Sequence, residues 1–214
     1  MKNIFIVGAT GGLGRHVLRG LLHRGGVEIV AFVRTPTKLD DLLNPHIHVV
    51  QGDFSSLSPA HLMGCDVVIA THSSANNERH VGYEKLVKNA VEGGVERLIG
   101  VGGAGQLCME NGQIKQADPS WFPALRSVTE DHQRGLKAVR KSKLDWTWVA
   151  PPYMPTDAAS VGGYVATNDA WNNTGMLPQV DVAQFIVDEA FEPKHIGHVV
   201  GLSARQPNET TVPI

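Results

Sequence analysis

Short apolar runs and amphipathic stretches alternate along most of this chain. The runs are rich in Val and Ile and too short for helices, whereas the stretches between them place apolar residues at helical spacing. This alternation predicts an α/β protein with a parallel sheet covered by helices on both faces. The expected strands are Ile4–Val7, Ile29–Val33, Ile47–Val50, Val67–Ala70, Leu98–Val101 and Trp146–Val149, and the expected helices lie at Arg15–Leu22, Glu84–Val91 and Glu130–Val139.

The pattern changes after Pro151-Pro152. Residues from about 151 to 180 are rich in Gly, Pro, Asn and Thr, with one short strand expected at Tyr164–Thr167. A helix at about Val182–Phe191 and a strand at Val199–Leu202 are expected to close the chain. Since no internal repeat or linker is present, we expect one domain over residues 1–214. Doubly wound sheets bind ligands beyond the carboxyl ends of their strands, so the irregular segment is expected on the substrate side.

A glycine-rich loop, Gly8-Ala9-Thr10-Gly11-Gly12-Leu13-Gly14, joins the first expected strand to the first expected helix. Its first glycine allows a sharp turn, its second lets backbone N–H groups approach a pyrophosphate, and its last lets the helix pack closely on the strand. The helix N-terminus adds a dipole that favours phosphate. The loop therefore predicts a Rossmann-type, doubly wound dinucleotide-binding fold, and the alternative is a glycine-rich turn without a ligand. The expected cofactor contacts are Gly8, Thr10, Gly11, Gly12, Leu13 and Gly14.

The end of the second expected strand indicates which dinucleotide is bound. NAD sites usually place a carboxylate there, which would repel the 2′-phosphate of NADP. This chain instead has Arg34, followed by the hydroxyl of Thr35 and a second cation at Lys38. A guanidinium can bind phosphate in a bidentate manner and stack on adenine. We therefore expect NADP(H), the alternative being that Arg34 is a solvated residue at a strand end.

Further cofactor contacts are expected where other strands end. Asp53 and Phe54 are typical of an adenine contact, although Gly-Asp is also an ordinary turn signal. Ala70, Thr71 and His72 follow the fourth strand beside the phosphate loop, where a lone His is also commonly a hydrogen-bonded loop residue. At the nicotinamide end, glycines would allow close approach and the other residues would supply flat or apolar surface. These expected contacts are Gly102, Gly103, Pro151, Pro152 and Tyr153.

The catalytic pair of classical short-chain dehydrogenases is missing. These enzymes use Tyr-x-x-x-Lys, in which the Lys charge lowers the pKa of the Tyr. Tyr83, Tyr153 and Tyr164 are the three tyrosines, and the residues four positions after them are Val, Asp and Asn. Tyr153 is therefore a candidate hydrogen-bond donor to a substrate and not a base.

Several motifs together carry a family resemblance over nearly the full length. They are Gly8-x-x-Gly11-x-x-Gly14, Val33-Arg34, Gly52-Asp53, Gly102-Gly103-Ala104-Gly105, Thr129-Glu130-Asp131-His132 and Ala150-Pro151-Pro152. In these the chain resembles the atypical short-chain dehydrogenases that lack the Tyr-Lys pair. Within them it is most similar to the NADPH-dependent flavin reductase/biliverdin-IXβ reductase group and its bacterial relatives. Those reductases often carry Ser or Thr where this chain has Gly102-Gly103, and His where it has Tyr153, which disfavours biliverdin as the acceptor.

The resemblance implies an NADPH-dependent oxidoreductase that transfers hydride to a flavin-like or quinone-like acceptor. It places His132 near the nicotinamide side, which makes His132 a second catalytic candidate, although Glu130 and Asp131 beside it are equally explained as acids at a helix N-terminus. An NADP(H)-sensing regulator similar to NmrA-type proteins is the alternative. A nucleotide-sugar isomerase or epimerase is disfavoured by the missing pair.

Composition narrows the partners. With 19 Lys and Arg against 21 Asp and Glu, the formal net charge is −2, which favours neither nucleic acid nor an anionic membrane. The ten His form no metal-binding spacing, so no metal is expected. The apolar runs are too short for a membrane span or a signal segment. We expect a cytoplasmic protein, monomeric or a small homo-oligomer, whose partner is a small-molecule acceptor.

Overall fold

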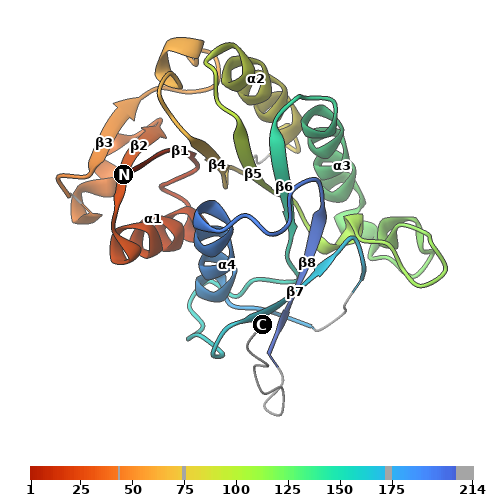
Figure 1. Cartoon of the computed structure of the whole chain (residues 1–214). Coiled ribbons are helices and arrows are strands. Elements are labelled where there is room, and N and C mark those ends of the chain that lie inside the picture. Colours follow the sequence, from red (N-terminus) through yellow and green to blue (C-terminus); the bar gives the residue numbers. More distant parts are fainter. Residues whose placement is uncertain (43, 74–75, 172–174, 206–214) are drawn as a thin grey trace.

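The computed structural model describes residues 1–42, 44–73, 76–171 and 175–205, which form an eight-stranded sheet between two pairs of helices (Figure 1). Every strand and helix expected from the sequence is present. The strands are β1 (Lys2–Val7), β2 (Val27–Val33), β3 (Ile47–Gln51), β4 (Val67–Ala70), β5 (Arg97–Val101), β6 (Asp145–Ala150), β7 (Tyr164–Asn168) and β8 (Val199–Ala204). The helices are α1 (Gly12–Arg24), α2 (Arg79–Glu92), α3 (Arg126–Arg140) and α4 (Gln179–Phe191).

The strand order is β3-β2-β1-β4-β5-β6-β8-β7. The direction of winding reverses between β1 and β4, the place where doubly wound folds bind ligands. All neighbouring strands are parallel except β7, which runs antiparallel to β8 at the edge of the sheet. The Rossmann-type fold is thus confirmed, and the expectation of a parallel sheet needs one correction at this edge.

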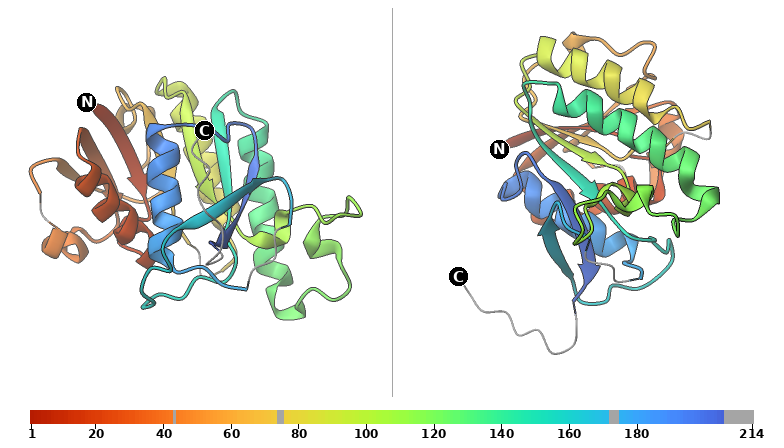
Figure 2. Two further views of the ribbon diagram at one scale, coloured as in Figure 1. Left: turned by 60° about the horizontal axis from the view of Figure 1, so that its bottom comes forward. Right: turned by 90° about the vertical axis from the view of Figure 1, so that its right-hand side faces the viewer.

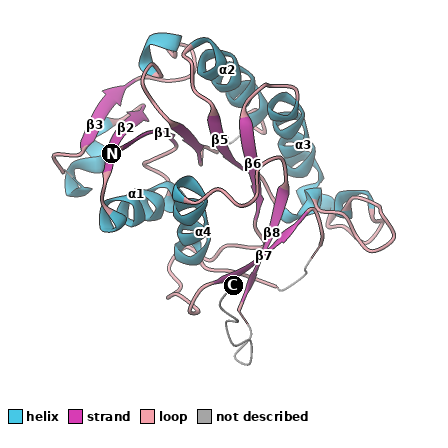
Figure 3. Cartoon of the chain, in the orientation of Figure 1, coloured by secondary structure: helices cyan, strands magenta, loops and turns pink. Residues whose placement is uncertain are grey.

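The helices cover the two faces of the sheet in pairs, as Figure 3 also shows. Helices α1 and α4 pack together over one face, and α2 and α3 pack together over the other (Figure 1). Each face has its own buried apolar cluster: Val17, Leu21 and Phe185 belong to the first, and Tyr83, Leu136 and Trp148 to the second. The β-strands contribute to both clusters because successive side chains of a strand point to opposite faces.

All four helices begin earlier than their apolar spacing predicted, α2 and α3 by the most. Helix α2 starts at Arg79 and α3 at Arg126. Between β5 and α3 the chain makes an excursion, residues 104–125, which contains three short 3-10 turns and projects beside α3 (Figure 2). Its Trp121 is buried against Trp171, with ring centroids 6.3 Å apart, so this aromatic residue anchors the excursion.

A buried ion pair joins two strands to α4. Arg97 of β5 contacts Glu189 of α4 at 2.7 Å, and the Arg97 and Glu189 side chains are only 9% and 2% exposed. The same guanidinium donates to the Thr147 hydroxyl of β6, at 2.6 Å. Glu189 also accepts hydrogen bonds from the backbone N–H groups of Lys194 and His195. This network lies at the starts of β5 and β6, away from the carboxyl ends of the strands.

Candidate functional site: a dinucleotide cleft at the β1/β4 switch

Two glycines of the loop after β1 are required by its geometry. Gly8 has φ +84°, and a Cβ there would lie 2.5 Å from the His72 backbone nitrogen. A Cβ on Gly14 would lie 2.1 Å from the Gly8 carbonyl oxygen. Only glycine fits both places, which confirms the predicted tight turn and the close packing of helix on strand.

The N-terminus of α1 is open to a ligand. Gly11 is its N-cap residue, no side chain among the described residues caps it, and its first turn contains no acid. The backbone N–H groups at the start of a helix lack partners within the helix and carry its positive dipole end. These features fit the pyrophosphate of a dinucleotide.

A cleft of about 740 Å³ opens beside this N-terminus, over the gap between β1 and β4. Nine of the expected cofactor residues line it, with others from the loops after β2, β3 and β4. The expected residues among them are Gly8, Thr10, Gly11, Arg34, Lys38, Asp53, Phe54, Thr71 and His72. The fold therefore brings predicted cofactor residues that lie up to more than sixty positions apart in the sequence into one cleft.

Two cations mark one end of the cleft. Arg34 and Lys38 are both exposed, and both belong to its lining. The Arg15 guanidinium of α1 donates to the Lys38 carbonyl at 2.6 Å and also pairs with Asp41, which fixes the turn that carries Lys38. The expected cationic replacement for a ribose-binding carboxylate is thus available to a ligand.

Aromatic rings form the wall at the β3 end. The Phe54 and His72 rings meet at 4.8 Å in an edge contact, and His72 lies 4.6 Å from Tyr83. Burial lowers the pKa of His72 to about 4, so the ring is neutral near pH 7. Its Nε2 contacts the Arg79 carbonyl at 3.3 Å. His72 therefore belongs to a packed aromatic wall as well as to the cleft.

Asp53 is both a turn residue and a lining residue. Its Oδ1 accepts hydrogen bonds from the Ser55 hydroxyl and from the backbone N–H groups of Ser55 and Ser56. These hydrogen bonds, that of the Ser55 side chain first, lower the pKa of Asp53, which keeps the carboxylate ionised and an acceptor. The turn expected at Gly-Asp is therefore confirmed, and the expected adenine contact of Asp53 stays a prediction.

Other expected cofactor residues lie next to the cleft but not in its lining. They include Gly12, Leu13 and Gly14 of α1, together with Thr35 and Ala70. The group expected at the nicotinamide end, Gly102, Gly103, Pro151, Pro152 and Tyr153, follows β5 and β6, further along the same edge of the sheet.

Gly102 is glycine for a different reason from the one the sequence suggested. A Cβ there would point into the protein and lie 2.1 Å from Gln106 Oε1 and 2.2 Å from Trp148 Nε1. These two atoms form a buried hydrogen bond of 2.7 Å. Gly102 is thus required by internal packing and not by the approach of a ring. At Gly103 a Cβ would lie 3.2 Å from His132 Nδ1, a tight contact.

The acids of the Thr-Glu-Asp-His motif do not lie at the start of their helix, where the sequence analysis placed them. Because α3 begins at Arg126, Glu130 and Asp131 are not at its N-terminus. Asp131, 1% exposed, instead accepts hydrogen bonds from the backbone N–H groups of Arg79 and His80 and contacts His80 Nδ1 at 2.6 Å. Burial alone would raise the pKa of Asp131, but these hydrogen bonds outweigh it and lower that pKa. The expectation that these acids lie at the start of their own helix is therefore wrong, and Asp131 instead caps the start of α2.

His132 lies buried beneath Gly103, with 6% of its surface exposed. Neither ring nitrogen has a hydrogen-bond partner among the described residues. Burial, reinforced by the charge of Arg79, lowers the pKa of His132 to about 3. The ring is neutral at physiological pH and is not poised as an acid.

The three tyrosines are also unsuited to acid–base work. Tyr83 is fully buried, its hydroxyl accepts from the Val101 N–H at 2.8 Å, and burial raises its pKa. Tyr164 bonds to Asp188, and burial followed by this bond raises its pKa. Tyr153 is 74% exposed and pairs with Met176 in an isolated bridge. No Lys is paired with any of them among the described residues.

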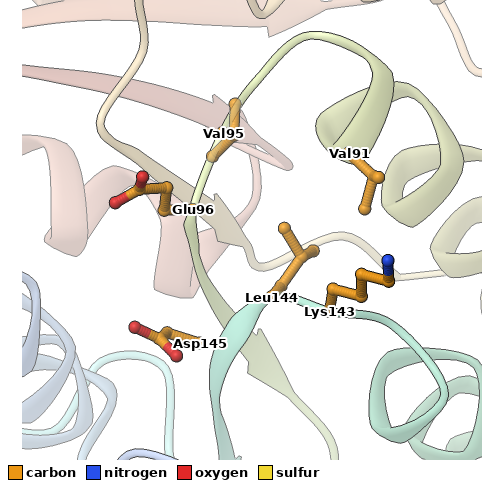
Figure 4. A pocket seen from close by; sticks show the side chains of 6 residues that line it. All are labelled: Val91, Val95, Glu96, Lys143, Leu144 and Asp145. Atoms are coloured by element: carbon orange, nitrogen blue, oxygen red, sulfur yellow. The ribbon is translucent and has the colours of Figure 1, made fainter.

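A second, smaller hollow of about 270 Å³ lies at the other end of the sheet (Figure 4). Val91, Val95 and Leu144 form its apolar part, and Glu96 and Asp145 point to the opposite side of β5 from Val91 (Figure 4). It adjoins the amino ends of β5 and β6, where doubly wound sheets do not bind their ligands. The cleft at the β1/β4 switch is therefore the candidate site.

Fold, glycine loop and open helix N-terminus together define a dinucleotide-binding protein of Rossmann type. The model of the NAD(P)H-binding family matches residues 8–193, so the chain belongs to this family. Without the Tyr-Lys pair it stands among the atypical short-chain dehydrogenases of that family.

Several known proteins are similar to this chain in sequence or in fold. A (4-alkanoyl-5-oxo-2,5-dihydrofuran-3-yl)methyl phosphate reductase of Streptomyces griseus is 30% identical over 151 residues, 69% of this chain. The match covers 46% of that relative, so the chain spans about half its length. A candidate epimerase of Bacteroides thetaiotaomicron is 26% identical, with a TM-score of 0.85 over 97% of this chain and 99% of its own. A candidate NADH-flavin reductase of Streptococcus pneumoniae, 21% identical, shares the fold with a TM-score of 0.82 over 96% of this chain and its entire length.

The described residues contain no group of three or more His, Cys, Asp or Glu that could hold a metal ion. Within the same residues, no helix has the length and apolar character needed to cross a bilayer.

Two residues beside the glycine loop were not predicted from the sequence. Arg15 is the first, because its partners, the Lys38 carbonyl and the Asp41 carboxylate, follow β2. The other is Gln179 of α4, whose side-chain amide lies against Gly12. No local pattern points to Gln179, since the contact spans most of the chain.

Proposed function

We propose that this protein is an NADPH-dependent reductase of a flavin-like or quinone-like acceptor. The observation that carries the proposal is the cleft itself, which combines an open helix N-terminus with two exposed cations, Arg34 and Lys38. When bound, NADPH supplies the hydride. The chain's own residues hold the dinucleotide and orient it at the carboxyl edge of the sheet.

The preference for NADP(H) over NAD(H) rests on Arg34. A guanidinium at the end of β2 matches the charge of a 2′-phosphate, and Lys38 adds a second positive charge on a turn held by Arg15. A carboxylate would be needed at this place to accept hydrogen bonds from the 2′-hydroxyl of NAD. Asp53 lies after β3 instead, where it fits an adenine contact.

The acceptor class follows from the side chains that surround the site. Tyr83 and His132 are buried, with pKa values shifted away from neutrality, and Tyr153 has no Lys beside it. A substrate that needs a strong protein acid is therefore disfavoured. A flavin or quinone delocalises the charge it gains and can take its proton from solvent, so the protein has mainly to hold two flat rings together. The exposed side chains of Tyr153 and Met176 offer apolar surface for such a ring.

NADPH oxidation tests the activity. The purified protein is mixed with NADPH and, in turn, FMN, riboflavin and a soluble quinone, and the loss of NADPH absorbance is followed. We expect acceptor-dependent turnover with at least one of them. If NADPH bound tightly but no acceptor at saturation gave turnover, the reductase proposal would be wrong, and an NADP(H)-sensing regulator would replace it.

Arg34→Glu tests the cofactor preference. The substitution replaces attraction to the 2′-phosphate by repulsion, so the Kd for NADPH should rise by about two orders of magnitude, and that for NADH far less. Lys88→Glu, an equal charge change at an exposed position of α2, is the control and should leave both constants unchanged. Equal losses for the two dinucleotides in Arg34→Glu would contradict the proposed contact.

A further inference from the structure

We propose that Gly82 of α2 is a specificity-determining residue for the adenine end of the cleft, because it leaves the space in which the Phe54 ring lies. The inference rests on the dinucleotide site proposed above and assigns to its adenine end a wall that includes α2. None of the cofactor contacts expected from the sequence lies on this helix.

Gly82 belongs to the lining of the cleft together with its neighbour Val81. Both lie in the first turn of α2, where Gly82 is buried and Val81 is 39% exposed. The lining also contains Phe54, from the loop after β3, and His72, from the loop after β4. Helix α2 therefore shares one wall of the cleft with two loops that carry expected cofactor residues.

The rings of Phe54 and His72 take the place that a side chain at position 82 would fill. A Cβ on Gly82 would lie 2.7 Å from Phe54 Cε2, 3.0 Å from Phe54 Cζ and 2.8 Å from His72 Nε2. Carbon atoms in favourable contact are about 3.5–4.0 Å apart, so a neighbour would have to move. Any residue larger than glycine at position 82 therefore changes this wall.

Backbone conformation does not account for the glycine. Gly82 is helical and is not among the glycines with positive φ, in contrast to Gly8. Glycine is also one of the least favourable residues within a helix, because it loses the most backbone entropy there. Its place in α2 is therefore explained by the two rings that pack against it.

Phe54 is the ring that a methyl group at position 82 would displace. His72 is held from two sides, since its Nε2 contacts the Arg79 carbonyl at 3.3 Å and its ring lies 4.6 Å from that of the fully buried Tyr83. Phe54 is half-buried and presents the far end of its side chain to Gly82. Because Phe54 also lines the cleft, its ring would move away from α2 and into the space for a ligand.

Adenine is the part of the dinucleotide that fits this wall. A base has apolar faces that stack on aromatic side chains, and the Phe54 ring offers such a surface. The Asp53 carboxylate, next in the chain to Phe54, can accept from the exocyclic amine of adenine. Since these two residues share one loop of the cleft lining, the position of the Phe54 ring sets the width left for the purine.

Binding measurements on full-length variants test this role. Gly82→Ala adds one methyl group against Phe54. Gly20→Ala is the matched control, because Gly20 is also helical and a Cβ there would lie 2.9 Å from Val187 Cγ2, in the contact between α1 and α4. Isothermal titration with NADPH and with adenosine 2′,5′-bisphosphate measures binding without turnover. The bisphosphate carries the adenine and the 2′-phosphate but no nicotinamide.

We expect Gly82→Ala to raise the Kd of both ligands by the same factor, about tenfold or more, because both place adenine beside Phe54. Gly20→Ala should leave both constants within about twofold of the parent protein. In a Phe54→Ala background, Gly82→Ala should change either Kd by less than about threefold, since the ring that it displaces is absent and only the contact with His72 remains.

Two results would overturn the inference. In one, Gly82→Ala binds adenosine 2′,5′-bisphosphate within about twofold of the parent protein. In the other, Gly82→Ala weakens binding as much in the Phe54→Ala background as in the parent, which would mean that the methyl group acts on the fold and not through Phe54.

The double variant also keeps the test decisive if Gly82→Ala alone does not fold. Phe54→Ala and Phe54→Ala/Gly82→Ala are then compared with each other, and a tenfold difference in Kd would equally contradict the role of Gly82. Failure of the parent protein to bind either NADPH or the bisphosphate would contradict the proposed function itself, so the two failures are distinguishable.

Discussion

At the scale of single residues, sequence patterns were informative where the partners are close in the chain. The roles of Gly8 and Gly14 depend on the same short loop, so their spacing sufficed to predict them. The sequence did not show what requires glycine at positions 102 and 12. Their space is taken by Trp148 and Gln179, side chains far away in the sequence, and no local pattern shows such a contact.

Tyr83 gives a prediction at this scale. Its buried hydroxyl contacts the Ala70 and Val101 carbonyls and accepts from the Val101 N–H, so it joins the ends of β4 and β5. Tyr83→Phe leaves buried backbone groups without that partner and should lower the free energy of unfolding by about 1–3 kcal/mol, measured by urea denaturation.

The control for Tyr83→Phe is Tyr153→Phe. The Tyr153 side chain is largely exposed, so this change should alter stability by less than about 0.5 kcal/mol. Comparing the two variants distinguishes the effect of removing a buried structural hydroxyl from that of removing an exposed hydroxyl on the expected substrate side. Loss of NADPH oxidation in Tyr83→Phe without loss of stability would contradict the structural role.

At the scale of secondary structure elements, the sequence predicted which elements exist better than where they begin and what they contact. Hydrophobic spacing located all strands and helices, because each must bury one face. It could not show that α2 starts at Arg79, since the acid that caps this start, Asp131, lies on α3. It also could not show that β7 pairs antiparallel with β8, which depends on the path of the connecting segments.

Asp131→Asn tests the link between α2 and α3. The substitution keeps the shape but removes the charge that accepts from the start of α2 and pairs with His80, so we expect a loss of about 2 kcal/mol in stability. Hydrogen exchange of the first turn of α2 should speed up most. Glu130→Gln, the exposed neighbouring acid, is the matched control and should have little effect. Uniformly faster exchange throughout the chain would contradict a local capping role.

At the scale of the whole molecule, polar side chains join elements to one another at both ends of the sheet. At the amino ends of β5 and β6, the buried Arg97–Glu189 pair joins these strands to α4. At the carboxyl ends, Asp131 joins α3 to the start of α2 next to the cleft. The first network spans elements far apart in the sequence, which is why it was not predicted. It keeps α4 at a fixed place relative to the sheet.

Near the cleft the molecule also holds two histidines in the neutral form, which makes its stability depend on pH. Burial lowers the pKa of His72 to about 4 and of His132 to about 3, whereas an unfolded His titrates near 6.5. Between these values the unfolded chain binds protons that the folded chain does not. The free energy of unfolding should therefore fall as the pH drops from about 6.5 to 4, by up to about 1.4 kcal/mol per pH unit for each His.

His132→Asn isolates one of the two contributions. Because Asn does not titrate, the variant should show a shallower dependence of unfolding free energy on pH between 6.5 and 4, whatever its stability at pH 7. Urea denaturation at several pH values in this range measures the slope directly. Carboxylates such as Asp131, whose pKa is lowered by hydrogen bonds, act in the same direction, but only at lower pH, and their effect is common to both proteins. An unchanged slope would mean that His132 takes up its proton as readily in the folded protein as in the unfolded chain, and that the ring beneath Gly103 is reached by solvent.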